Sequence, residues 1–127
     1  MPVTTAPDAR HQFQIVLMTK SCSVAECRAS LDEAIAAPAF IERRTLLVDR
    51  READLVTVDF VDEMVSFMAS RHDVLVGARM AIVTGSDASF GMCRMLQLKV
   101  EARNPDIAIR PCRSYDEAVA WLSVPAG

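Results

Sequence analysis

Two spacings of apolar residues alternate along this chain of 127 residues, and they predict strands and helices in turn. Short runs rich in branched apolar residues are typical of buried strands and occur at 13–19, 45–49, 79–84 and 107–112. After each run, apolar residues recur at every third or fourth position, which is the spacing of one buried helix face. These segments predict helices from Ser23 to Pro38, from Thr57 to about Arg71, over about 88–103, and from Ser114 to about Leu122.

Residues that favour helix ends support these boundaries. Ser23 and Glu26 have the spacing of a capping box, in which each side chain accepts a hydrogen bond from the other residue's backbone amide. Ser114 and Glu117 repeat the same spacing, and Thr57 is expected to cap the second helix. Pro38 should end the first helix, because its ring clashes with the preceding turn.

The order of these elements predicts the fold class. Strands that alternate with helices through short connections form parallel sheets with right-handed crossovers. Residues 1–11 are polar and irregular, apart from a short edge strand at 3–6 that ends at Pro7. Pro111 places the strand at 107–112 at the other edge of the sheet, where a missing backbone donor is tolerated. We therefore expect one α/β domain over residues 1–127, with four or five mainly parallel strands and four helices.

Composition narrows the function class. The chain carries a net charge of −3, whereas nucleic-acid binding depends on basic side chains that neutralise phosphates. No apolar run approaches the roughly 20 residues of a membrane helix, and no signal sequence is visible. We therefore expect a cytoplasmic protein that binds no nucleic acid and has no integral membrane segment.

Neither a metal nor a cofactor is predicted. The residues that could ligate a metal are scattered along the chain: Cys22, Cys27, Cys93, Cys112, His11 and His72. They form no Cys-x-x-Cys pair, and no glycine-rich nucleotide-binding loop is present. The simpler interpretation is that the cysteines are small buried side chains in a reducing compartment. No catalytic residues are predicted.

Several segments, taken in order, resemble one family. They are Pro38-Ala-Phe, the strand Leu46-Leu-Val-Asp, the strand Ala81-Ile-Val, Phe90-Gly-Met-Cys-Arg-Met, and Arg113-Ser-Tyr-Asp-Glu-Ala-Val-Ala-Trp-Leu. Together they resemble the SpoIIAA-like small bacterial proteins, which are related to STAS domains and to the CRAL-TRIO lipid-binding fold. The resemblance covers about residues 12–122 and implies a β-α superhelix with the helices mainly on one face of the sheet.

The resemblance also implies a function, and this chain differs from the STAS antagonists at one functional residue. STAS antagonists carry a phosphorylated serine after the strand that corresponds to 46–49, where this chain reads Asp49-Arg-Arg-Glu-Ala. The phosphoacceptor serine is therefore absent. Most SpoIIAA-like proteins have no assigned activity, so the resemblance implies a non-enzymatic interaction or regulatory module with an unknown protein partner.

The candidate binding residues follow two parallel strands, whose C-terminal ends lie at the same end of the sheet. Ligands commonly bind at the C-terminal ends of the strands in open α/β sheets. A charged loop at 49–54 and the loop 85–89 are both expected there, and we expect them to share one surface with the start of the third helix. The predicted site is Asp49, Arg50, Ser86, Asp87, Phe90, Gly91 and Arg94. The simpler alternatives are that Ser86 or Asp87 caps the helix and that Arg94 pairs with Glu101 on the surface.

Two other functions stay open. A small-molecule carrier would bind an apolar or anionic, lipid-like ligand beneath the second and third helices, where Met64, Met68, Met92 and Met95 are expected. Methionine as flexible core filler is the simpler interpretation of these residues. A hydrolase that uses Cys93 or Ser89 is the third alternative.

Four helices on one face leave the opposite face of the sheet uncovered, and a homodimer partner is one way to cover it.

Overall fold

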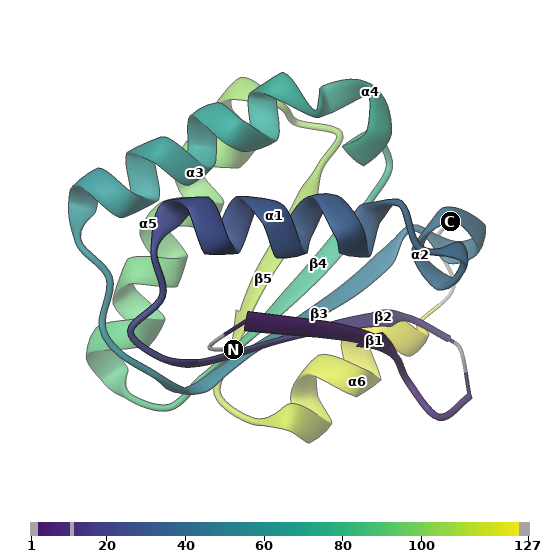
Figure 1. The fold of residues 1–127 in the computed structure, drawn as a ribbon, viewed down its shortest axis with the longest axis horizontal. Coiled ribbons are helices and arrows are strands. Elements are labelled where there is room, and N and C mark those ends of the chain that lie inside the picture. Colours follow the sequence, from purple (N-terminus) through teal and green to yellow (C-terminus); the bar gives the residue numbers. More distant parts are fainter. Residues whose placement is uncertain (1–2, 11, 125–127) are drawn as a thin grey trace.

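The computed structural model describes residues 3–10 and 12–124, which form one five-stranded sheet and six helices. The strands lie in chain order across the sheet: β1 (Val3–Pro7), β2 (Gln14–Lys20), β3 (Thr45–Ala53), β4 (Arg79–Thr84) and β5 (Ala108–Cys112). β1 pairs antiparallel with β2, and all later pairs are parallel. The predicted α/β class and mainly parallel sheet are confirmed (Figure 1).

β3 is longer than the sequence pattern predicts. The sequence pattern predicts that the strand ends at Asp49 and that Arg50, Arg51 and Glu52 lie in a charged loop. In the structure these residues continue the strand. Arg50 pairs with Thr84 of β4, and beyond a break in register Glu52 and Ala53 pair with Thr19 and Lys20 of β2. The prediction of a loop directly after Asp49 is therefore wrong.

The four long helices match the prediction, and the structure adds two short helices. The long helices are α1 (Val24–Ile35), α3 (Val58–Ser70), α5 (Asp87–Arg103) and α6 (Tyr115–Ser123). Short helices α2 (Pro38–Arg43) and α4 (His72–Leu75) were not predicted. Pro38 begins α2 rather than directly ending α1, because the first turn of a helix does not need the amide hydrogen that proline lacks.

The predicted caps form, with one difference. The Glu26 amide donates to Ser23 Oγ at 3.1 Å, and the Ser23 amide donates to Glu26 Oε1 at 3.0 Å, which completes the capping box. The Glu117 amide likewise donates to Ser114 Oγ. The Glu117 carboxylate, however, accepts from the amide of Arg113, one residue before the predicted donor.

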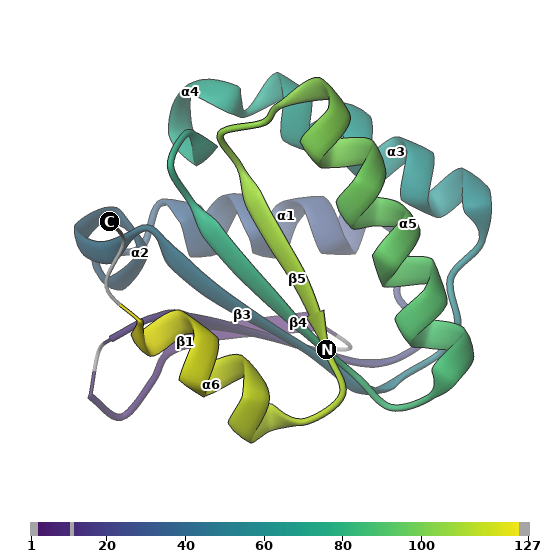
Figure 2. The same ribbon diagram turned by 180° about the vertical axis from the view of Figure 1, so that it is seen from behind.

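Most of the long helices lie on one face of the sheet, as the resemblance implies, but the opposite face is not left uncovered as expected. α1, α3 and α5 pack on one face, and α6 packs alone on the other, over β3, β4 and β5 (Figure 2). Phe13, Leu47 and Ala81 belong to the smaller core beneath α6. Leu17, which alternates with the buried Val16 and Met18 along β2, stays 39% exposed. α6 therefore covers this face over β3, β4 and β5, and a homodimer partner on the remainder of the face stays a prediction.

Candidate functional site

The predicted site residues on β3 lie on opposite faces of the sheet. Side chains alternate along a strand, so Arg50 points with Leu46 and Val48 toward the larger core, whereas Asp49 points with Leu47 toward the α6 face. Both are buried, with 6% of Arg50 and 7% of Asp49 exposed. The expectation that Asp49 and Arg50 share one surface is therefore wrong.

Asp49 is held by Arg51, the second residue after it on the same face. The carboxylate accepts from the Arg51 backbone amide (3.1 Å), from its Nε (3.0 Å) and from its Nη2 (2.8 Å). Burial alone would raise the pKa of Asp49, but these hydrogen bonds and the charge of Arg51 outweigh it, and the pKa lies below its usual value. The Arg51 guanidinium also lies over the ring of Tyr115 in α6, 5.2 Å from its centre.

The site residues in and before α5 make mostly local contacts. Ser86 caps α5 by accepting from the Ser89 amide at 3.1 Å, as the simpler interpretation expects. Asp87 is exposed and forms an ion pair with Arg113, whose guanidinium also lies 4.0 Å above the centre of the Phe90 ring. These contacts join the start of α5 to the end of β5 at the surface.

Arg94 and Gly91 lie further along α5. Arg94 donates to Gln97 Oε1 at 2.7 Å rather than pairing with Glu101. A Cβ atom at Gly91 would meet nothing within 4 Å. The seven predicted residues thus divide into buried Arg50, buried Asp49 on the other face, and the group in and before α5. A binding role for that third group stays a prediction.

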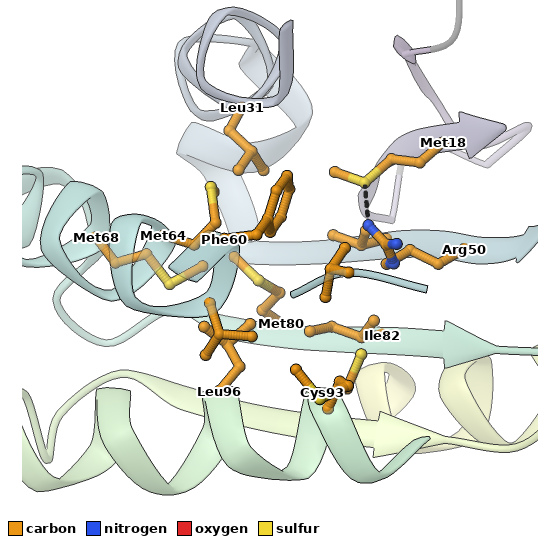
Figure 3. A pocket seen from close by; sticks show the side chains of 14 residues that line it. Met18, Leu31, Arg50, Phe60, Met64, Met68, Met80, Ile82, Cys93 and Leu96 are labelled. Carbon is orange, nitrogen blue, oxygen red and sulfur yellow. Dashed lines mark hydrogen bonds between the residues drawn. The ribbon is translucent and has the colours of Figure 1, made fainter. Parts of the chain in front are cut away.

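Arg50 belongs instead to an apolar cavity that the sequence only partly indicates. The cavity has a volume of about 50 Å³ and lies between the sheet, α1, α3 and α5 (Figure 3). Its lining is apolar and rich in methionine, with one charged side chain: Met18, Leu31, Val48, Arg50, Val56, Phe60, Val61, Met64, Met68, Met80, Ile82, Met92, Cys93 and Leu96. The expectation of methionines beneath the second and third helices holds for Met64, Met68 and Met92, whereas Met95 does not line the cavity.

The Arg50 guanidinium is only weakly partnered for a buried charge. Its Nη2 donates to the Asp54 carbonyl oxygen at 2.8 Å, and its Nη1 donates to Met18 Sδ at 3.3 Å (Figure 3). No carboxylate pairs with it among the described residues. A guanidinium has five N–H donors, and thioether sulfur is a weak acceptor. Arg50 therefore retains donors that an anion would satisfy better.

A second hollow adjoins the cavity at Arg50. This outer cleft has a volume of about 190 Å³ and shares Arg50, Val56 and Phe60 with the inner cavity. Its rim includes Lys20 and the capping residue Thr57, and its other lining residues are Ser21, Cys22, Asp54 and Leu55. The guanidinium thus lies between an apolar interior and a polar cleft, an arrangement suited to a molecule with one apolar and one anionic end.

One sequence pattern could have placed Arg50 in this site, whereas no pattern indicated the methionines in the strands. Leu46, Val48 and Arg50 alternate as inward-facing residues once the strand is extended past Asp49, which would have placed Arg50 in the core. Met18 and Met80 lie in strands and show no helical spacing, so the pattern that found the helical methionines missed them.

The potential metal ligands remain dispersed in the structure. Within residues 3–10 and 12–124, no three His, Cys, Asp or Glu side chains converge as metal ligands would. His11 lies outside the described residues, and His72 Nε2 lies 3.2 Å from Asp106 Oδ2. Cys27, Cys93 and Cys112 are buried, whereas Cys22 is half-buried. No helix in the described part of the chain has the length and apolarity needed to cross a bilayer.

Comparison with known proteins supports the fold. No family model and no curated protein matches the chain. Among solved structures, it is similar to an uncharacterized protein of the DUF3478 family with a SpoIIAA-like fold from Shewanella loihica PV-4. The two share 11% sequence identity with a TM-score of 0.60, over 94% of this chain and 91% of the other. This chain therefore has a SpoIIAA-like fold, as its sequence motifs predict.

Proposed function

We propose that this protein is a non-enzymatic binding module whose ligand is a small apolar molecule with an anionic group. The observation that carries the proposal is the buried guanidinium of Arg50, which lines an otherwise apolar cavity and has no carboxylate partner in the described chain. A buried charge is costly unless it is paired. A carboxylate or phosphate on the ligand would supply the missing partner and could form two parallel hydrogen bonds with the guanidinium.

The size of the cavity constrains the apolar end of the ligand. A volume of about 50 Å³ is far below the several hundred Å³ of pockets that enclose drug-sized ligands. Five methionines line the cavity, and their unbranched side chains can adopt other rotamers at little cost. We therefore favour a short or medium alkyl chain that enters as these side chains move, with its charged end at Arg50.

The hydrolase alternative has less support. Both of its candidate nucleophiles are buried, with Cys93 5% and Ser89 7% exposed. Burial raises the pKa of the Cys93 thiol, although the charge of Arg50 opposes that shift, so the reactive thiolate is disfavoured.

The binding test uses one ligand pair and one variant pair. Octanoate and 1-octanol have the same chain length but differ in charge, and calorimetric titration measures both affinities. We expect the native protein to prefer octanoate by about tenfold, since a hydrogen bond to a charged group contributes on the order of 1.5 kcal/mol. Arg50→Met should remove the preference, whereas Arg51→Met, which changes the next residue on the opposite face, should keep it. Equal loss in both variants, or no preference in the native protein, contradicts the proposal.

Methionine methyl resonances locate the ligand independently of affinity. In protein labelled with ¹³C at the methionine methyl groups, octanoate should shift the signals of the cavity residues Met64, Met68 and Met80. Met95 lies outside the cavity lining and is the internal control. Shifts confined to Met95 would place the ligand elsewhere.

A second candidate function is the protein-interaction module that the SpoIIAA-like resemblance implies. The observation that favours it is Leu17, a large apolar side chain left 39% exposed on the part of the sheet beyond α6. Native mass spectrometry of protein purified from its own cells distinguishes the candidates. A bound small molecule supports the carrier, whereas ligand-free protein in a reproducible complex, or a dimer that Leu17→Lys dissociates, supports the interaction module.

A further inference from the structure

Two cysteines that the sequence leaves as unconnected buried residues lie in contact. Cys22 precedes the cap of α1 and Cys27 lies in its first turns, and their Sγ atoms are 3.2 Å apart. A disulfide needs the two sulfur atoms to approach to about 2 Å, so a shift of little more than 1 Å brings them to bonding distance. The other two cysteines, Cys93 and Cys112, have no such neighbour among the described cysteines.

The backbone around the pair is fixed by the start of the helix. The Cys27 amide donates to the Ser23 carbonyl oxygen at 3.0 Å, and the capping box between Ser23 and Glu26 closes the same turn. Cys27 therefore lies within this hydrogen-bonded turn, and Cys22 directly precedes it in the chain.

The two thiols differ in accessibility. Cys22 is half-buried and lines the outer cleft beside Arg50, whereas Cys27 is fully buried behind it. An oxidant that enters the cleft therefore reaches Cys22 first, and Cys27 lies within reach of the oxidised product. An accessible thiol beside a buried resolving thiol is the arrangement found in redox-sensitive cysteine pairs.

We propose that Cys22 and Cys27 form a modification site at which a peroxide converts the two thiols into an intramolecular disulfide. The Cys22 thiolate attacks hydrogen peroxide, breaks its O–O bond and becomes a sulfenic acid, with hydroxide as the leaving group. The Cys27 sulfur then attacks the Cys22 sulfur, the disulfide bond forms, and the Cys22 hydroxyl leaves as water with the Cys27 proton. Overall two thiols lose two electrons, and one peroxide is reduced to two water molecules.

Burial of Cys27 sets the order of these steps. Burial, the hydrogen bond with Cys22 and the proximity of that thiol together raise the pKa of Cys27 to about 12. Cys27 is therefore a poor thiolate on its own, so the first attack on peroxide falls to Cys22. In the second step, the proximity of Cys27 to the sulfenic acid on Cys22 compensates for the weak acidity of the Cys27 thiol.

The test exploits the placement of both cysteines in one tryptic peptide, residues 21–28, which follows Lys20 and ends at Arg28. The native protein is treated with a modest excess of hydrogen peroxide, denatured, alkylated with iodoacetamide and digested. We expect peptide 21–28 to escape alkylation and to be lighter than its reduced form by two hydrogen atoms. The peptides with Cys93 and Cys112 should remain reduced and alkylated. A peptide 21–28 that is alkylated at both cysteines, or overoxidised without a link, would overturn the proposal.

Single variants test the order of attack. In Cys27→Ser, dimedone should trap a sulfenic acid on Cys22 after peroxide treatment, because no resolving thiol remains. In Cys22→Ser, Cys27 should stay reduced under the same conditions. Dimedone capture at Cys27 but not at Cys22 contradicts the proposed order, and a circular dichroism spectrum like that of the native protein verifies that each variant is folded. The result is independent of whether the inner cavity binds a ligand.

Discussion

Arg50 and Arg51 are adjacent in β3, yet their side chains lie on opposite faces of the sheet in opposite electrostatic situations. Arg51 is half-exposed and makes two side-chain hydrogen bonds to the Asp49 carboxylate, whereas Arg50 is buried against apolar side chains and donates to a carbonyl oxygen and a thioether. Two identical residues in sequence therefore provide a matched pair in which only the environment differs.

Substitution of each arginine by methionine should change stability in different ways. Arg50→Met removes a buried unpaired charge and leaves an apolar side chain of similar length, so we expect unchanged or increased stability. Arg51→Met leaves the buried Asp49 carboxylate without its side-chain donors and should cost about 1 to 3 kcal/mol. Urea denaturation followed by circular dichroism measures both. A larger loss in Arg50→Met than in Arg51→Met would show that Arg50 is structural.

The hydrogen bonds on Asp49 also predict how stability depends on pH. The pKa of Asp49 is lowered in the folded protein, because the hydrogen bonds from Arg51 outweigh the opposing effect of burial. Its contribution is therefore fully present above the unfolded-state pKa of about 3.9, and it is lost as pH falls through the lower folded-state pKa. Denaturation midpoints measured between about pH 6 and pH 2.5 should fall less steeply for Asp49→Asn than for the native protein. Parallel curves for the two proteins would contradict this assignment.

Two glycines predict opposite effects of the same substitution. A Cβ atom at Gly85 would lie 2.3 Å from the Arg51 carbonyl oxygen, so Gly85→Ala forces apart β3 and the turn that leads into α5. We expect a loss of several kcal/mol, within the range of severe backbone clashes. Gly91 lies inside α5 with open space around it, so Gly91→Ala should gain about 0.5 to 1 kcal/mol from helix propensity. Thermal unfolding of the two variants measures both effects, and a neutral Gly85→Ala would mean that the turn can move away from β3.

The buried thiols predict slow alkylation in the folded state. Burial raises the pKa of Cys93, and burial together with the charge of Glu117 raises that of Cys112 to about 11. At about pH 8 both should resist iodoacetamide until the protein is denatured, while the half-buried Cys22 reacts first. Mass spectrometry of tryptic peptides over time measures the order. Rapid alkylation of Cys93 in the folded protein would instead support the hydrolase alternative.

Local sequence signals determined most of the secondary structure. The capping residues Ser23 and Thr57 begin their helices as expected, since a hydroxyl three residues before a backbone amide needs only local geometry to accept its hydrogen bond. Pro111 lies in the edge strand β5 for an equally local reason, because it has no amide hydrogen to donate to a further strand.

The candidate site was less accessible to such signals. The pattern placed Arg50 in a loop, because a charged run usually marks the end of a strand, whereas pairing with β2 extends β3 to Ala53. That extension decides which face each side chain occupies, since one residue along a strand reverses its direction. The methionine spacing indicated a group beneath the helices, but the contributions of Met18 and Met80 depend on how the strands pack.

The sequence by itself determined the fold class, the order of the elements and the SpoIIAA-like motifs, because these follow from periodicity, capping and turn chemistry within short segments. Only the tertiary structure decided that α6 covers the face opposite the other long helices, that Arg50 enters the methionine-lined cavity, and that Cys22 lies against Cys27. The physical reason is that these features depend on long-range strand pairing and helix docking, which bring together residues that no local spacing connects.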